Sequence, residues 1–278
     1  MCSGYIIGFV KSQTLKTISD LIISKKPLIM GILNVTPDSF FDGGKYFQIE
    51  DAIKQIEKLI SGGMDIIDIG GESTRPGAEY VSEEEELRRV IPAIKQCRDT
   101  VNRISNKHSL ISIDTYKANV AQLALIAGAN MINDVSGLTM DPDMVKVAAK
   151  ANCPIVIMHN NGIPATKPDC KGESPTRLLQ EIYHWLEKQT NYAIANGIKK
   201  ENIIIDVGIG FGKTAEEDLL LVKNLKEFKS LGFPIIVGPS KKSFIKKLFP
   251  NENVEMKSKE IVELAVKNGA DIVRVHAA

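Results

Sequence analysis

The sequence is poor in cysteine and tryptophan and carries almost no net charge. Its 278 residues include four cysteines and one tryptophan, and the formal net charge is +1. The cysteines lack the paired spacing of a metal site, which predicts a reduced, cytoplasmic protein; they are Cys2, Cys97, Cys153 and Cys170. The balanced charge gives no electrostatic reason to expect nucleic acid or an anionic membrane as a partner.

Long apolar runs are also missing. The N-terminal stretch GYIIGFV is too short to span a bilayer, and it lacks the basic flank and cleavage site of a signal peptide. No glycine- and serine-rich linker divides the chain. The remaining composition, 44% hydrophobic and 25% charged, is that of a soluble globular protein with one large core.

Eight short apolar segments are predicted β-strands. In chain order they read PLIMGILNV, DIIDIG, LISID, MINDV, PIVIMH, NIIIDVG, PIIVGPS and DIVRV. Each is apolar almost throughout, which is typical of strands buried on both faces of a parallel sheet. Amphipathic stretches separate them, for example residues 117–127 and 176–195. Capping boxes at Ser82 and Thr214 predict two helix starts.

This alternation predicts an α/β protein with a (β/α)8 barrel. We expect the barrel over residues 27–278, preceded by an N-terminal extension, 1–26. A doubly wound open sheet is the alternative. The amphipathic part of the extension, residues 14–24, is expected to pack across the barrel floor rather than to replace an outer helix.

The segment DVGIGFGKT, residues 206–214, looks at first like a phosphate-binding loop. A Walker loop would need glycine at the position of Val207, and a dinucleotide fingerprint would need different glycine spacing after the first strand. Alternate glycines still let the backbone turn sharply and let a flat ligand approach. Asp206, directly before them, therefore becomes a candidate ligand-binding residue.

Polar side chains end every predicted strand, and in a barrel these ends form one active-site face. Asp114, Asn133 and Asp206 offer carboxylates and an amide, which suit a flat heterocycle with parallel N–H donors along one edge. The cationic or protonatable side chains suit phosphate or diphosphate; they are Arg75, Lys242, Arg274 and His276. Asn34 offers an oxygen for Mg²⁺.

Several motifs resemble one family closely, the dihydropteroate synthases. They are MGILNVTPDSFFDGG, DIIDIGGESTRPGA, ISIDT, INDVSG, VIMH, DVGIGFGK, GPSKKSFI and IVRVH, in the family's order along nearly the whole chain. The resemblance implies that 6-hydroxymethyl-7,8-dihydropterin diphosphate is joined to 4-aminobenzoate with release of diphosphate. It also implies Mg²⁺, a homodimer and competition by sulfonamides.

The resemblance assigns residues to each part of the site. Those implied for the pterin are Asp114, Asn133, Met158, Asp206, Phe211, Lys242 and Arg274. Those implied for the diphosphate are Asn34, Arg75, Arg274 and His276, with Asn34 also at the metal. Those implied for 4-aminobenzoate are Thr74, Pro76, Phe211, Ser240 and Lys241. Diphosphate is expected to leave first, with Asp42 stabilising the pterin cation and with Arg75 and Lys242 as further catalytic residues.

The sequence departs from the family pattern at three places. Val207 stands where the family has proline, and Lys241 where it has arginine; the lysine stem can still cover an aromatic ring, so we expect altered affinity. The sequence ends at RVHAA, without an eighth helix. If that helix is needed, the protein should be unstable or a poor dimer. A truncated chain or a degraded gene is an alternative explanation of the missing helix.

Two other functions are alternatives. A folate-dependent corrinoid methyltransferase would share the acids that face the pterin but would have no use for the STRPG and SKKS segments. A decayed synthase would bind pterin without turnover. His108, His159, His184 and Asp68 are expected to be structural or solvent-facing, and the run of four glutamates from Glu83 is expected to be a solvated first helical turn.

Overall fold

The computed structural model describes residues 18–35, 49–74, 77–104, 109–164 and 175–276. Eight parallel strands follow one another around a closed barrel. They are β1 Leu28–Asn34, β2 Ile66–Gly70, β3 Leu110–Asp114, β4 Met131–Asp134, β5 Ile155–Met158, β6 Ile203–Asp206, β7 Ile235–Val237 and β8 Ile272–Val275. Because β8 pairs with β1 as well as with β7, the barrel prediction is confirmed and an open sheet is excluded.

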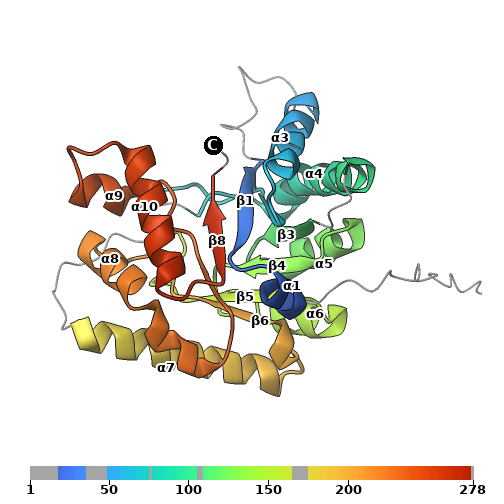
Figure 1. Ribbon diagram of the computed structural model, residues 1–278. Helices are drawn as coiled ribbons and strands as arrows, with labels where there is room; N and C mark the ends of the chain where they lie inside the picture. The colour runs from blue at the N-terminus through green and yellow to red at the C-terminus, as the bar shows by residue number, and fades with distance from the viewer. Residues whose placement is uncertain (1–17, 36–48, 75–76, 105–108, 165–174, 277–278) are drawn as a thin grey trace, which may run out of the picture.

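The helices lie around the outside of the barrel (Figure 1). They are α1 Ile18–Ser24, α3 Ile49–Ser61, α4 Glu83–Ile104, α5 Ala118–Ala127, α6 Met144–Ala151, α7 Pro175–Ala195, α8 Ala215–Lys223, α9 Ser243–Leu248 and α10 Val254–Lys267, with the 3-10 helices η1 Lys200–Asn202 and η2 Leu225–Leu231. Except for α1, the apolar faces of the α-helices share a core with the outward side chains of the strands. Within the described ranges, none of them is long and apolar enough to cross a bilayer.

Helix α1 packs across the floor of the barrel, as expected. Ile18, 1% exposed, joins a cluster with inward-facing residues from every strand, among them Met30 of β1, Ile204 of β6 and Ile272 of β8. Leu21 also packs against this cluster. One end of the barrel is therefore filled by apolar side chains, and polar groups can gather only at the other end, where the strands finish.

The two predicted helix starts differ in detail. Thr214 begins α8 with a complete capping box, in which its side chain and that of Glu217 satisfy each other's backbone donors. Before α4, the Ser82 hydroxyl accepts from the backbone N–H of Glu85 at 3.2 Å. The Glu85 carboxylate binds Arg88 and Arg89. In both cases the side-chain oxygen at the N-cap stabilises the first turn.

Candidate active site at the C-terminal ends of the strands

Arg274 on β8 joins four strands through a network of polar contacts. Its Nε donates to Asp68 Oδ2 at 2.6 Å, and its Nη2 donates to Asp114 Oδ2 at 2.7 Å. Asp68 Oδ2 also accepts from Asn133 Nδ2 at 3.0 Å. We call Asp68, Asp114, Asn133 and Arg274 the polar cluster. Three of its members were predicted from the sequence, so residues far apart in the chain meet as expected.

Asp68 was expected only as a structural residue. Its carboxylate is 0% exposed and contacts both Arg274 and Asn133, so it fixes the orientation of two side chains predicted to contact ligand. The sequence gives one signal for it, since an acid inside an otherwise apolar strand needs a charged partner. That signal does not identify Arg274, which is 206 positions away.

Asp206 ends β6 and lies within the electrostatic reach of the polar cluster. Its Oδ1 accepts from the backbone N–H of Gly208 at 2.8 Å. Burial raises the pKa of Asp206 to about 6, although the Gly208 N–H and the charges of Lys242, Lys213 and Arg274 oppose the rise. Burial also raises the pKa of Asp114, with the charge of Arg274 opposing. Both carboxylates are therefore held where ionisation is costly without a cationic or N–H partner.

A small apolar cluster lies beside these polar groups. Its buried members are Tyr116, Val135, Met158 and Phe211, and Ile163 packs against it. The Lys242 Nζ lies 4.6 Å from the centroid of the Phe211 ring, a cation–π distance. The arrangement places flat and polarizable side chains next to hydrogen-bonding groups, as a planar polar ligand requires.

The alternate glycines of residues 208–212 make a tight turn that other residues could not adopt. Gly208 has φ +71°, and a Cβ there would lie 1.8 Å from the carbonyl oxygen of His159. Lys213, which was considered at first for phosphate binding, points inward instead. Its Nζ donates to the carbonyls of Gly208 at 2.9 Å and Phe211 at 3.3 Å. The segment is therefore a backbone turn braced by a buried lysine, which the sequence did not predict.

The described residues among those expected at the anion and at 4-aminobenzoate lie around the same strand ends. Asn34 ends β1 and is paired in register with Gly70, which is itself paired with Asp114. The Ser240 hydroxyl, after β7, accepts from the backbone N–H of His276 at 3.5 Å. These contacts bring the ends of β1, β7 and β8 to the face that carries Asp114.

Lys241 and Thr74 complete the described part of this set. Lys241 adopts φ +55°, and its backbone N–H donates to the hydroxyl of Ser258 at 3.0 Å. Thr74 is partly buried four positions after the end of β2. Asp42, Arg75 and Pro76 lie outside the described residues. Across the described ranges, no group of three His, Cys, Asp or Glu side chains could hold a metal ion.

His159 and His184 are structural and solvent-facing, respectively, in agreement with the prediction from the sequence. His159 is buried with its ring edge-on to Trp185 at 5.1 Å, and burial lowers its pKa to about 3, so it is neutral. The side chain of His184 is 72% exposed. His108 lies outside the described residues.

The expectation for the glutamate run was wrong for its last member. Glu86 is 1% exposed and pairs with Lys117, because Gly71 lets the side chain approach the end of β2. A Cβ on Gly71 would meet Glu86 Cγ at 3.0 Å. One face of the first turn of α4 is therefore turned toward the barrel rather than toward water.

Comparisons with known proteins show to which family the chain belongs. The model of the pterin-binding enzyme family matches residues 30–276. A dihydropteroate synthase from Clostridium beijerinckii is 47% identical over 91% of this chain and 90% of its own length. The structure of dihydropteroate synthase from Clostridium difficile, determined in the presence of pteroic acid, superposes with a TM-score of 0.78 at 42% identity, covering 90% of this chain and 91% of that one.

A second structure, dihydropteroate synthase from Xanthomonas albilineans with 4-aminobenzoic acid, gives a TM-score of 0.79 at 38% identity and covers 90% of this chain and 88% of that one. Both the identity and the extent of the match exceed what a shared barrel fold alone would produce. The chain belongs to the pterin-binding enzyme family, and within it to the dihydropteroate synthases.

Proposed function

We propose that this protein joins 6-hydroxymethyl-7,8-dihydropterin diphosphate to 4-aminobenzoate, giving 7,8-dihydropteroate and diphosphate. The observation that carries the proposal is the meeting of Asp114, Asn133 and Arg274 in one polar cluster, with Asp206 and Lys242 close enough to influence its charges. The names of the relatives support the same reaction.

The pterin is assigned to the polar cluster and the neighbouring apolar cluster. Asp206 and Asn133 would accept from and donate to the heterocycle edge, while Met158 and Phe211 would pack on its faces. A carboxylate that accepts two parallel N–H donors forms a short, charge-assisted pair, which is strongest where water is excluded. Lys242 and Arg274 would supply the positive charge beside the ring.

The diphosphate is assigned to Arg274 and His276 at the same face, and to Arg75, which lies outside the described residues. Mg²⁺ binds oxygen ligands and commonly takes a single protein oxygen together with substrate phosphates. The Asn34 side chain fits that role, since it ends β1 and provides a neutral oxygen. Mg²⁺ would supply charge neutralisation of the leaving diphosphate when bound.

The second substrate, 4-aminobenzoate, is assigned to a wall that several loops provide: Thr74, Pro76, Phe211, Ser240 and Lys241. The C–O bond to diphosphate breaks first, and the resulting pterin cation is captured by the aryl amine, which forms the C–N bond and loses a proton. Asp42 would stabilise the cation, because fixed charge aimed at developing charge is a large catalytic contribution. Sulfonamides, as mimics of 4-aminobenzoate, are expected to compete at this wall.

Release of diphosphate tests the proposal against its alternatives. The purified protein should release diphosphate from the pterin substrate in the presence of Mg²⁺ and 4-aminobenzoate, and form dihydropteroate. No release at saturating substrates would overturn it. Methyl transfer from a folate to a corrinoid protein would establish that alternative, and stabilisation by pterin without turnover would establish the decayed synthase.

Three further assignments accompany the activity. A cytoplasmic location is supported by the buried, unpaired thiols of Cys97 and Cys153. A homodimer is supported by the family resemblance, and sedimentation tests it together with the expectation about the eighth helix. Residues 1–26 are proposed as an extension to the barrel of 27–278, with α1 as its described end.

A further inference from the structure

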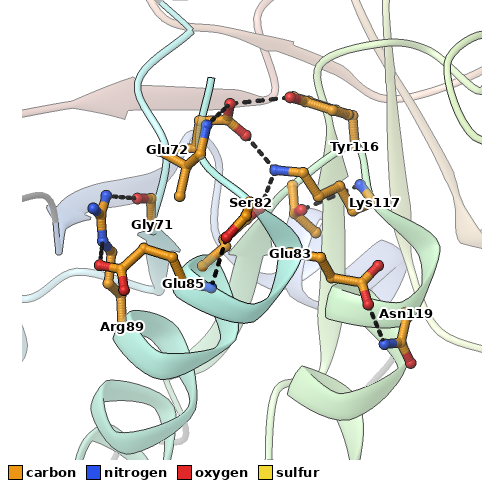
Figure 2. A network of polar contacts seen from close by, with 12 residues as sticks. Gly71, Glu72, Ser82, Glu83, Glu85, Arg89, Tyr116, Lys117 and Asn119 are labelled. Atoms are coloured by element: carbon orange, nitrogen blue, oxygen red, sulfur yellow. Dashed lines mark hydrogen bonds and ion pairs between the residues drawn. The ribbon is translucent and has the colours of Figure 1, made fainter. Parts of the chain in front are cut away.

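A buried ion cluster lies just outside the polar cluster, where β2 and β3 end (Figure 2). Lys117 Nζ lies 2.5 Å from Glu72 Oε2 and 2.5 Å from Glu86 Oε2. The side chains of Lys117 and Glu72 are each 8% exposed, and that of Glu86 is 1% exposed. We call these three residues the ion cluster. None of them was assigned a role in the reaction above.

Glu72 uses its carboxylate to close the loop that follows β2. Its Oε1 accepts from the backbone N–H of Val81 at 3.0 Å, nine positions later in the chain. The two ends of the segment between β2 and α4 are therefore tied by one side chain. Thr74, assigned to 4-aminobenzoate, lies between these ends.

The same carboxylate is connected to the pterin side of the site. The Tyr116 hydroxyl donates to Glu72 Oε1 at 3.0 Å (Figure 2), and the Tyr116 ring belongs to the apolar cluster that contains Met158 and Phe211. Tyr116 follows Asp114, the last residue of β3, by two positions. Glu72 thus contacts the wall proposed for the pterin and spans the loop proposed for the second substrate.

Lys117 holds Glu72 in this position. Burial opposes the charge of Lys117, but its contacts with Glu72 and Glu86 outweigh burial and raise its pKa, so it stays cationic. The rings of Tyr80 and Tyr116 lie 5.0 and 4.7 Å from its Nζ. The ammonium is thereby confined by two carboxylates and two aromatic rings.

Stability alone does not account for this arrangement. Buried ion pairs often contribute less than apolar residues of similar volume, whereas their directional contacts fix one geometry. Here two carboxylates face one ammonium, and Glu72 also takes hydrogen bonds from Val81 and Tyr116. A carboxylate used by groups from two segments, the loop before α4 and the turn after β3, has a defined position, and so do the described ends of the loop that it ties.

We infer that Glu72 is a positioning residue for 4-aminobenzoate, held by Lys117, and that its hydrogen bond from Val81 fixes the position of Thr74 at the second-substrate wall. The inference rests on the proposed function. The pterin contacts of Asn133 and Asp206 come from β4 and β6, and Glu72 reaches the pterin wall through the Tyr116 hydroxyl rather than through a polar contact to the ring, so the larger effect should fall on 4-aminobenzoate.

The test is Glu72→Gln, which keeps the side-chain shape but places an amide against Lys117. We expect the KM for 4-aminobenzoate to rise about tenfold or more, because small misplacements of binding groups are costly. Binding of 6-hydroxymethylpterin, measured by calorimetry, should change less than about twofold. Lys117→Met, which keeps the stem and removes the charge, should produce the same split, and Lys117→Arg should restore part of it.

Glu83→Gln is the matched control. Glu83 lies on the same helix as Glu86, but its carboxylate accepts from Asn119 of α5 at 2.6 Å; Glu83 and Asn119 are labelled in Figure 2. It should leave both substrates unaffected. Equal losses for both substrates, or no loss with Glu72→Gln, would overturn the inference.

Amide exchange separates this inference from the proposed function. The backbone N–H of Val81 should exchange at least about tenfold faster in Glu72→Gln and in Lys117→Met than in the parent protein, because its acceptor is lost or displaced. If the parent protein releases no diphosphate but Val81 responds in this way and 4-aminobenzoate binding weakens, the proposed function fails and the positioning role stands. Unchanged exchange at Val81 would refute the positioning role even in an active enzyme.

Discussion

Arg274 and Asp68 are 206 positions apart in the chain, yet Arg274 Nε lies 2.6 Å from Asp68 Oδ2. The pair joins β8 to β2 through the interior of the barrel, and both strands neighbour β1. The side chains are 21% and 0% exposed. A charged residue assigned to ligand binding is thus anchored by a fully buried acid, which makes binding and folding depend on the same contact.

Asp68→Asn should destabilise the protein and weaken pterin binding together. Arg274 would keep its contact with Asp114 but lose the fully buried carboxylate that binds its Nε, so we expect the free energy of unfolding to fall by about 2–4 kcal/mol. Arg274 would also lose its orientation. Chemical denaturation and pterin calorimetry on the same preparation check both effects. Asp143→Asn is the control, since its partner Lys146 is 76% exposed and such pairs are worth about 0–1 kcal/mol.

Asp206→Asn should act in the opposite sense on stability. Burial raises the pKa of Asp206 from 3.8 to about 6, so the ionised carboxylate at pH 7 destabilises the folded state relative to the unfolded chain. The asparagine can still accept from Gly208, and we expect the unliganded variant to be more stable by up to about 3 kcal/mol. Pterin affinity should fall by more than about tenfold, because a charge-assisted contact is lost. A variant with unchanged pterin affinity would remove Asp206 from its assigned role.

The same pKa predicts how stability and binding vary with pH. Between about pH 4 and 6 the folded protein retains a proton at Asp206 that the unfolded chain has released, so the contribution of Asp206 to stability falls as the pH rises through this window and then levels off. The gap in stability between the parent protein and Asp206→Asn should therefore close as the pH falls toward 4. Pterin affinity should decrease below about pH 6 in the parent protein, where the carboxylate becomes protonated. Calorimetry from pH 5 to 8 checks this, and an equal slope in Asp206→Asn would contradict it.

The sequence predicted the parts of this site that follow from strand position. The predicted strands are apolar almost throughout, with polar residues at or near their ends, and a closed parallel barrel brings these ends to one face. Asp114, Asn133 and Arg274 therefore meet as expected. The glycines after Asp206 form a tight backbone turn, in agreement with the sharp turn that their spacing predicts.

Contacts between side chains from different segments were not predictable in the same way. Glu86 was taken for a solvated residue because it stands in an acidic first turn, and only the glycine at Gly71 makes room for it beside Lys117. Lys213 gave no sign that it would turn inward to the carbonyls of its own loop. Periodicity indicates which face of an element is buried, but pairing of buried charges depends on the three-dimensional distance between elements.

Gly208→Ala should destabilise the protein through both backbone strain and a steric collision. The residue has φ +71°, and its added Cβ would lie 1.8 Å from the His159 carbonyl oxygen, a rigid backbone atom. We expect a loss of unfolding free energy well above the about 1–2 kcal/mol that a left-handed alanine costs alone, together with weaker pterin binding as the turn is displaced from Asp206. Gly63→Ala is the matched control, since Gly63 has φ +80° and nothing within 4 Å of an added Cβ. Chemical denaturation of both variants measures the two losses of unfolding free energy. The loss in Gly63→Ala gives the cost of backbone strain, and the additional loss in Gly208→Ala gives the cost of the collision with His159. Equal losses would show that the turn can move away from His159.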